Sequence, residues 1–207
     1  ESWKMNQVAL ATLRTPKGEG EAEDYWCRRV RDAAFEQVEQ AADLGSEIHA
    51  ALECATAGES WDEERFGVYV RPVLDFIARE GMTVTAREKR VVNGGHGFAG
   101  TTDLLFTWQG GKPGILDYKT KKTKPGEKVE AYDEHRLQLA AYAATEYGEE
   151  RVGDVAAFNV FVSSTEPGRV EIIRHGDLTR DWLAFKMLAS LWRYSKGYDP
   201  RFTAPAA

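Results

Sequence analysis

The sequence predicts an α/β fold in which helices flank a central β-sheet. Apolar residues recur at helical spacing through most of residues 1–80. Three strand-like runs then follow between residues 83 and 120, before a further helix and two more strands. This order of elements is typical of a layered α/β domain, and the length of 207 residues favours one domain with additions.

We therefore expect a single domain over 1–207. Its parts are a helical N-terminal segment over 1–80, a core over 81–162 and a C-terminal strand and helix over 163–207. The N-terminal segment contains several apolar stripes at steps of three or four residues: Met5 to Leu13, Trp26 to Ala42, Ile48 to Ala55 after Gly45, and Phe66 to Ile77. Gly58 and Gly81 end the last two patterns, and Pro72 is expected to kink the last helix or to mark its start.

The three strands are predicted over 83–92, 97–106 and 114–120, with an Asn-Gly-Gly turn between the first two. Asp103 lies midway along the second apolar run. Asp117 and Lys119 close the third run, where a period of two places both side chains on one face. A helix over 133–147, strands over 155–162 and 170–174, and a closing helix that carries Trp182 and Trp192 complete the pattern.

Asp103 and Asp117 are acids within apolar strands. Two carboxylates held about 4 Å apart repel by roughly 4 kcal/mol at an effective dielectric constant of 20. Such a pair is seldom found in an apolar sheet without a counter-charge, and a divalent metal ion is the expected one.

Four short motifs appear in a fixed order: His49 on a helix, Gly100-x-x-Asp103, Asp117-x-Lys119 and Gln138-x-x-x-Tyr142. In this order and spacing they resemble the RecB-type branch of the PD-(D/E)XK nucleases, over roughly residues 44–162. The resemblance implies a restriction-endonuclease-like core, which is a mixed sheet flanked by helices. Iron-sulfur members of this branch carry four cysteines, whereas this chain has only Cys27 and Cys54, so no cluster is implied.

The resemblance also implies the roles of the site residues. Mg²⁺ or Mn²⁺ is expected at Asp103, Asp117, the backbone carbonyl of Tyr118 and the imidazole of His49. Lys119 is expected to orient or deprotonate the attacking water and to stabilise the transition state. Gln138 is expected to position the water or a phosphate.

Other readings of these residues stay open on the sequence alone. A lone helix histidine such as His49 is more often a packing residue than a ligand, and the family pattern is what favours the ligand. Glu88 either faces the site or is solvated within the charged run 87–90. Gln138 and Tyr142 either border the cleft or satisfy each other.

A lysine-rich segment follows the third strand, with Lys121, Lys122 and Lys124 near its start. Such a run is either a solvated loop or a surface that contacts the phosphates of DNA, and its position beside Asp117 favours DNA. The net charge of −6 argues against a protein that coats nucleic acid nonspecifically, but it is compatible with a local basic channel.

With two cysteines, no apolar run long enough to span a membrane and no signal peptide, we expect a soluble cytoplasmic protein with free thiols. The resemblance implies a DNA exonuclease that leaves 5′-phosphates, in bacterial or phage DNA recombination, repair or processing. A recombination or replication protein is a further expected partner, and the oligomeric state is left open. Two alternatives are a catalytically silent DNA-binding or scaffold subunit and a metal-dependent hydrolase of another substrate.

Overall fold

The computed structural model describes residues 2–202, with side chains described for 5–36 and 43–202. By its internal contacts the chain forms two compact units, Glu1–Glu47 and Ile48–Ala207. The single-domain description of the chain stays a prediction. No helix within the described residues has the length and apolar character needed to cross a bilayer.

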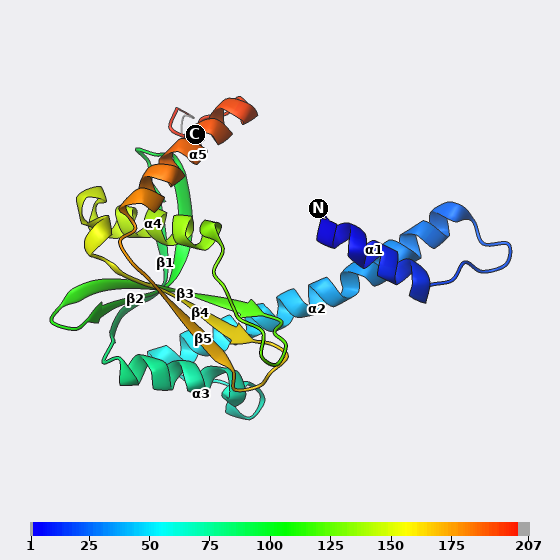
Figure 1. Cartoon of the computed structure of the whole chain (residues 1–207), viewed down its shortest axis with the longest axis horizontal. Coiled ribbons are helices and arrows are strands. Elements are labelled where there is room, and N and C mark those ends of the chain that lie inside the picture. The colour runs from blue at the N-terminus through cyan, green and yellow to red at the C-terminus, as the bar shows by residue number, and fades with distance from the viewer. Residues whose placement is uncertain (1, 203–207) are drawn as a thin grey trace. The chain divides into compact units, whose positions relative to one another are not determined.

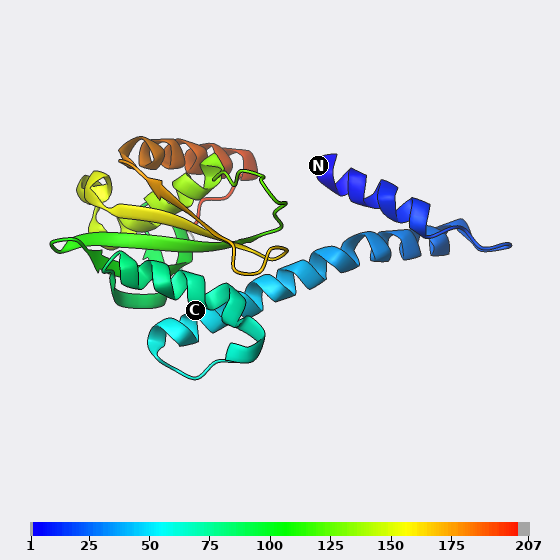
Figure 2. The same cartoon turned by 60° about the horizontal axis from the view of Figure 1, so that its bottom comes forward.

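The first unit is a pair of helices. Helix α1 (Ser2–Arg14) packs beside the first part of α2 (Glu23–Ala57), as Figures 1 and 2 show. Ala11, Val30 and Ala34 form the small core between them. The Trp26 indole also donates a hydrogen bond of 2.7 Å to the Thr15 carbonyl. Because no proline interrupts α2, it continues through Gly45 as one helix, so the two stripes predicted around that glycine belong to one element.

The second unit is built around a five-stranded sheet in the order β1-β2-β3-β4-β5. The strands are β1 (Thr83–Asn93), β2 (Phe98–Trp108), β3 (Lys112–Lys121), β4 (Ala156–Ser163) and β5 (Val170–His175). All neighbours are antiparallel except β3 and β4, which are parallel. The predicted α/β fold with a mixed sheet flanked by helices is confirmed.

Helices cover both faces of this sheet (Figure 2). Helix α3 (Glu63–Arg79) lies on one face, where the Phe76 ring contacts Phe158 of β4. Pro72 lies inside α3 and does not begin it; the helix begins after Asp62, whose side chain accepts a hydrogen bond of 3.0 Å from the Arg65 amide. On the other face lie α4 (Asp133–Tyr147), the short 3-10 helix η1 (Glu149–Asp154) and α5 (Thr179–Lys196).

The main core lies between the sheet and these last helices. It joins Leu105 and Ile115 of the sheet to Leu139 of α4 and to Trp182 of α5. Every residue of β4 is buried, as expected for a central strand covered on both faces. The sheet face that carries Leu105 and Ile115 also carries Asp103 and Asp117, because side chains alternate along each strand.

Candidate active site

The site lies where the sheet opens between β2 and β3. The β2–β3 pairing ends at Leu104 and Leu116, although both strands continue with their outer neighbours. Beyond this point the Tyr118 amide donates to a side chain of β2 and not to its backbone: the acceptor is Asp103 Oδ2, at 2.6 Å. The carboxylate of Asp103 therefore closes the end of the ladder and is held next to β3.

Three potential metal ligands meet at this opening: His49 of α2, Glu88 of β1 and Asp103 of β2, here called the acid cluster. One ligand atom from each lies within 4.8 Å of the other two. His49 Nδ1 is 3.8 Å from Asp103 Oδ2. The structure therefore brings Glu88 to the site, in agreement with the first of its two readings.

Glu88 reaches the site through an unusual backbone conformation. Its φ is 41°, although it lies inside a strand, and its neighbours Arg87 and Lys89 pair with Leu104 and Thr102 on either side of Asp103. A left-handed conformation is unfavourable for a residue with a Cβ atom and costs about 1–3 kcal/mol. This strain is found at the residue that turns a carboxylate toward Asp103.

Burial raises the pKa values of both carboxylates of the acid cluster. Burial, followed by repulsion from Asp117, raises the pKa of Asp103 to about 7, although the Tyr118 amide and Lys119 act in the opposite direction. Burial and the charge of Glu53 also raise the pKa of Glu88. Burial lowers the pKa of His49, which favours the neutral imidazole that can bind a metal. Two carboxylate oxygens and an imidazole nitrogen fit the ligand preferences of a hard divalent ion.

Asp117 is only 3% exposed and lies beside this cluster, but its oxygens are engaged elsewhere. Its Oδ1 accepts a hydrogen bond of 2.6 Å from Lys119 Nζ, and its Oδ2 accepts one of 2.7 Å from Asn159 Nδ2. The prediction that Asp117 and Lys119 share a face is confirmed. Tyr118 lies between them with its side chain buried, and a backbone hydrogen bond links it to His49.

The other two predicted motifs form a chain of contacts that ends at Lys119. Lys119 Nζ donates to Gln138 Oε1 at 3.3 Å, and Gln138 Nε2 donates to Tyr142 Oη at 3.5 Å. The Tyr142 ring lies directly over Gly100, where any Cβ atom would overlap it. Because Gly100 of the G-x-x-D motif has no side chain, the Tyr142 ring can occupy the position from which it contacts Gln138.

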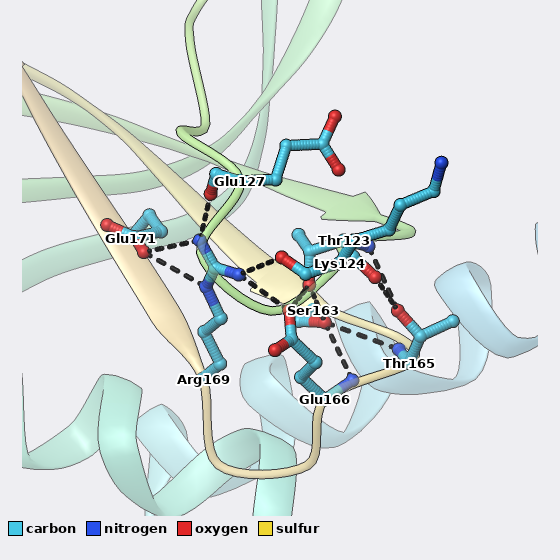
Figure 3. Close-up of polar contacts among 8 residues, drawn as sticks. All are labelled: Thr123, Lys124, Glu127, Ser163, Thr165, Glu166, Arg169 and Glu171. Atoms are coloured by element: carbon cyan, nitrogen blue, oxygen red, sulfur yellow. Dashed lines mark hydrogen bonds and ion pairs between the residues drawn. The ribbon is translucent and has the colours of Figure 1, made fainter.

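The lysine loop, residues 121–132, is fixed to the turn between β4 and β5 by Arg169 (Figure 3). Arg169 donates to the backbone carbonyls of Lys124 at 2.9 Å and Glu127 at 2.5 Å. The same guanidinium pairs with Glu166 at 2.6 Å and Glu171 at 3.0 Å.

Thr123 adds a second attachment of the lysine loop to the same turn. Its backbone exchanges hydrogen bonds with Thr165 Oγ1, and its hydroxyl contacts Ser163 Oγ at 2.6 Å and the Glu166 carboxylate. The loop is therefore an ordered part of the structure that lies next to the site.

The lysines of this loop differ in their surroundings. Lys121 Nζ lies 5.1 Å from the centre of the Tyr132 ring, and Lys128 pairs with Glu130 at 2.9 Å. Lys122 and Lys124 are exposed and have no ion-pair partner within the part of the chain that the structure describes. Figure 3 shows the Lys124 side chain extending away from the Arg169 network.

Two residues of the site were not predicted: Asn159 of β4 and His175 at the end of β5. Asn159 pairs in register with Asp117 and is fully buried. His175 Nε2 lies 2.7 Å from Asn159 Oδ1. A sequence signal for Asn159 existed, because it is the one polar residue within the apolar run 155–162, where an unpaired amide would be unfavourable.

A family model described as the PD-(D/E)XK nuclease superfamily matches residues 11–191 of this chain. No match was found among curated proteins. Among solved structures, one described as "Crystal structure of SSO0001" has 15% sequence identity and a TM-score of 0.34; the match covers 90% of this chain and 84% of that chain.

Proposed function

The chain belongs to the PD-(D/E)XK nuclease superfamily, and on this premise we propose that it is a DNA exonuclease that requires Mg²⁺ or Mn²⁺. The observation that carries the proposal is the group at the β2–β3 opening. There a buried carboxylate, Asp117, bonds the ammonium of Lys119 beside a cluster of acids with raised pKa values. Superfamily members use divalent metals, and a His/Glu/Asp cluster suited to one is present.

In this proposal His49, Glu88, Asp103 and Asp117 hold the metal, with the Tyr118 carbonyl as a further ligand. When bound, a divalent ion would supply positive charge for the phosphate oxygens and make a water molecule more acidic. The acid cluster supports this assignment, because burial and the nearby carboxylates Asp117 and Glu53 disfavour the charged forms of Asp103 and Glu88, and a bound cation would favour those forms.

Lys119 is proposed to orient the attacking water and to stabilise the negative charge that grows on the phosphate. Its ammonium is held from two sides, by Asp117 at 2.6 Å and by Gln138 at 3.3 Å, so it is already in place before substrate arrives. Gln138, which Tyr142 holds in turn, is proposed to position the water or a phosphate oxygen.

The lysine loop is proposed to contact the DNA backbone. Lys122 and Lys124 are exposed on a loop whose backbone Arg169 bonds at two carbonyls, and such bonds reduce the conformational entropy that a loop loses when phosphates bind. The resemblance of the ordered motifs to the RecB-type branch is the basis for three parts of the proposal. These are exonuclease action, 5′-phosphate products and a role in recombination or repair.

A time course on end-labelled linear DNA and on closed circular DNA tests the proposal, with Mg²⁺ or Mn²⁺ against EDTA. We expect the linear DNA to be degraded from its ends, in single- or double-stranded form, while the circles persist. The Lys119→Ala variant should lose at least about 100-fold in kcat. Lys186→Ala is a matched control, because Lys186 also pairs with a carboxylate, Glu149 at 2.9 Å, but lies on α5 outside the site.

Cleavage of circular DNA at the same rate as linear DNA would show that the protein is an endonuclease and not an exonuclease. Full activity of Lys119→Ala would contradict the proposed site. DNA binding without cleavage in any divalent metal would favour the silent DNA-binding subunit instead.

A further inference from the structure

Asn159 bonds the Asp117 oxygen that Lys119 does not contact, and it uses both ends of its side-chain amide. Its Nδ2 donates to Asp117 Oδ2 at 2.7 Å, and its Oδ1 lies 2.7 Å from His175 Nε2. A carboxylate only accepts hydrogen bonds, so the NH₂ group must face Asp117 and the amide oxygen must face the histidine. His175 Nε2 therefore carries the proton and donates to Asn159.

This arrangement fixes the direction of every hydrogen bond from His175 to Lys119. His175 donates to Asn159, Asn159 donates to Asp117, and Lys119 donates to the other oxygen of Asp117. Burial lowers the pKa of His175 to about 4, which agrees with a neutral imidazole that has one N–H to give. The plane of the Asp117 carboxylate is thereby set from both sides.

Asn159 and His175 are buried polar residues, and each is a hydrogen-bond partner of the other. Asn159 is fully buried in an otherwise apolar strand, and His175 is 6% exposed. An apolar side chain at position 159 would pack in the core without needing a hydrogen-bond partner. A buried amide, in contrast, is unfavourable unless it is fully hydrogen-bonded. The pair is explained if the carboxylate in front of it must be held in one orientation.

We propose that Asn159 and His175 are positioning residues that hold the Asp117 carboxylate for metal binding and cleavage. The proposal rests on the proposed function, in which Asp117 is a metal ligand. Groups that orient a metal-binding side chain without touching the ion typically change metal affinity or activity by about 10–100-fold when they are removed.

The test measures Mn²⁺ affinity by calorimetry on the protein without DNA, together with kcat and KM for linear DNA. Asn159→Leu should weaken Mn²⁺ binding by about 10–100-fold and lower kcat with little change in KM, because it removes the donor to Asp117. His175→Leu leaves Asn159 in place and should have a smaller effect of the same kind. His175→Gln keeps an N–H donor near the Nε2 position and should recover most of the loss.

His96→Leu is the matched control, because His96 also bonds an acceptor, Glu149 Oε1 at 2.7 Å, but lies outside the site. It should leave Mn²⁺ affinity and kcat unchanged. If Asn159→Leu does not fold, the two His175 variants decide the matter. Loss in His175→Leu with recovery in His175→Gln supports the proposal, whereas equal behaviour of the two variants overturns it.

The outcomes separate this inference from the proposed function. Wild-type protein that binds Mn²⁺ and degrades DNA, with folded Asn159 and His175 variants that do the same, would overturn the positioning role alone. Wild-type protein that neither binds Mn²⁺ nor degrades DNA would overturn the proposed function and the positioning role with it.

Discussion

Two polar clusters lie beside β3 and the loop that follows it: the acid cluster of His49, Glu88 and Asp103, and the Arg169 network of the lysine loop. In the Arg169 network the carboxylates have hydrogen-bond donors, and the pKa of Glu166 is lowered, first by Thr123 and also by Arg169. In the acid cluster the carboxylate pKa values are raised. Hydrogen-bond donors thus dominate around the carboxylate of Glu166, whereas burial dominates around the carboxylates of Asp103 and Glu88.

The largest effect that tests this contrast is expected from Asp103→Asn. Loss of a proposed metal ligand should lower DNA cleavage by about 1,000-fold or more, which is within the range that single catalytic groups supply. The same change should stabilise the metal-free fold, because an amide cannot carry the charge that this site disfavours. Cleavage assays and urea denaturation in EDTA measure the two effects, and a metal-free variant less stable than wild type at pH 8 would argue against an unbalanced carboxylate.

The gain in stability should depend on pH in one direction. The pKa of Asp103 is raised to about 7 in the folded protein, from 3.8, so the folded state favours its protonated form. The stability that protonation of Asp103 contributes is complete below the pKa of the unfolded chain. It is lost as the pH rises toward 7, at up to about 1.4 kcal/mol per pH unit. The difference between Asp103→Asn and wild type should therefore grow from pH 4 to pH 7 and then level off.

Metal addition is expected to have the next largest effect. A divalent ion that binds only the folded protein at 100 times its Kd adds about 2.7 kcal/mol of stability. Mn²⁺ should therefore raise the Tm of the wild type at pH 8, and excess EDTA should reverse the shift. Asp103→Asn should show little shift. An equal rise in both proteins would place the ion elsewhere.

In the Arg169 network, the Arg169→Met change should weaken DNA binding while the rate of cleavage of bound DNA stays nearly the same. The lysine loop loses its bonds from Arg169 to the carbonyls of Lys124 and Glu127. We expect KM for DNA to rise about fivefold with kcat nearly unchanged, which is the signature of lost uniform binding. Arg71→Met is the control, since Arg71 pairs with Glu63 on the surface of α3. A large fall in kcat would mean that the lysine loop also positions the proposed catalytic residues.

The smallest effects are expected from Lys122→Ala and Lys124→Ala. Each should lower DNA affinity by about two- to threefold near physiological salt and reduce the slope of log affinity against log salt by about 1. Lys128→Ala is the control within the same loop, because its ammonium already pairs with Glu130. Binding titrations at several salt concentrations measure all three, and identical slopes would exclude contacts between these lysines and phosphates.

The sequence was sufficient to predict the α/β fold and the superfamily. Alternation within β3 placed Asp117 and Lys119 together, and the helix that carries Gln138 and Tyr142 begins and ends at the predicted residues. These features depend on local periodicity, which a single sequence carries. The proposed role of each residue in cleavage stays a prediction.

The parts that escaped prediction depend on contacts between distant segments. The sequence left two readings of Glu88 open, because the left-handed backbone that turns its carboxylate toward Asp103 has no residue pattern of its own. His175 had no identifiable partner in the sequence, because Asn159 lies 16 residues away on the neighbouring strand. Gly45 was expected to separate two stripes, but one glycine costs a long helix only about 1 kcal/mol.

The parallel pairing of β3 with β4 affects the order in which the protein can fold during translation. Parallel neighbours need a long crossover, here the lysine loop, α4 and η1, so Asp117 meets Asn159 only after residue 159 has left the ribosome and the crossover has closed. A nascent chain that stops before β4 has both acidic strands but not the amide that holds Asp117. The proposed active site is therefore completed late, when most of the polypeptide has already been synthesised.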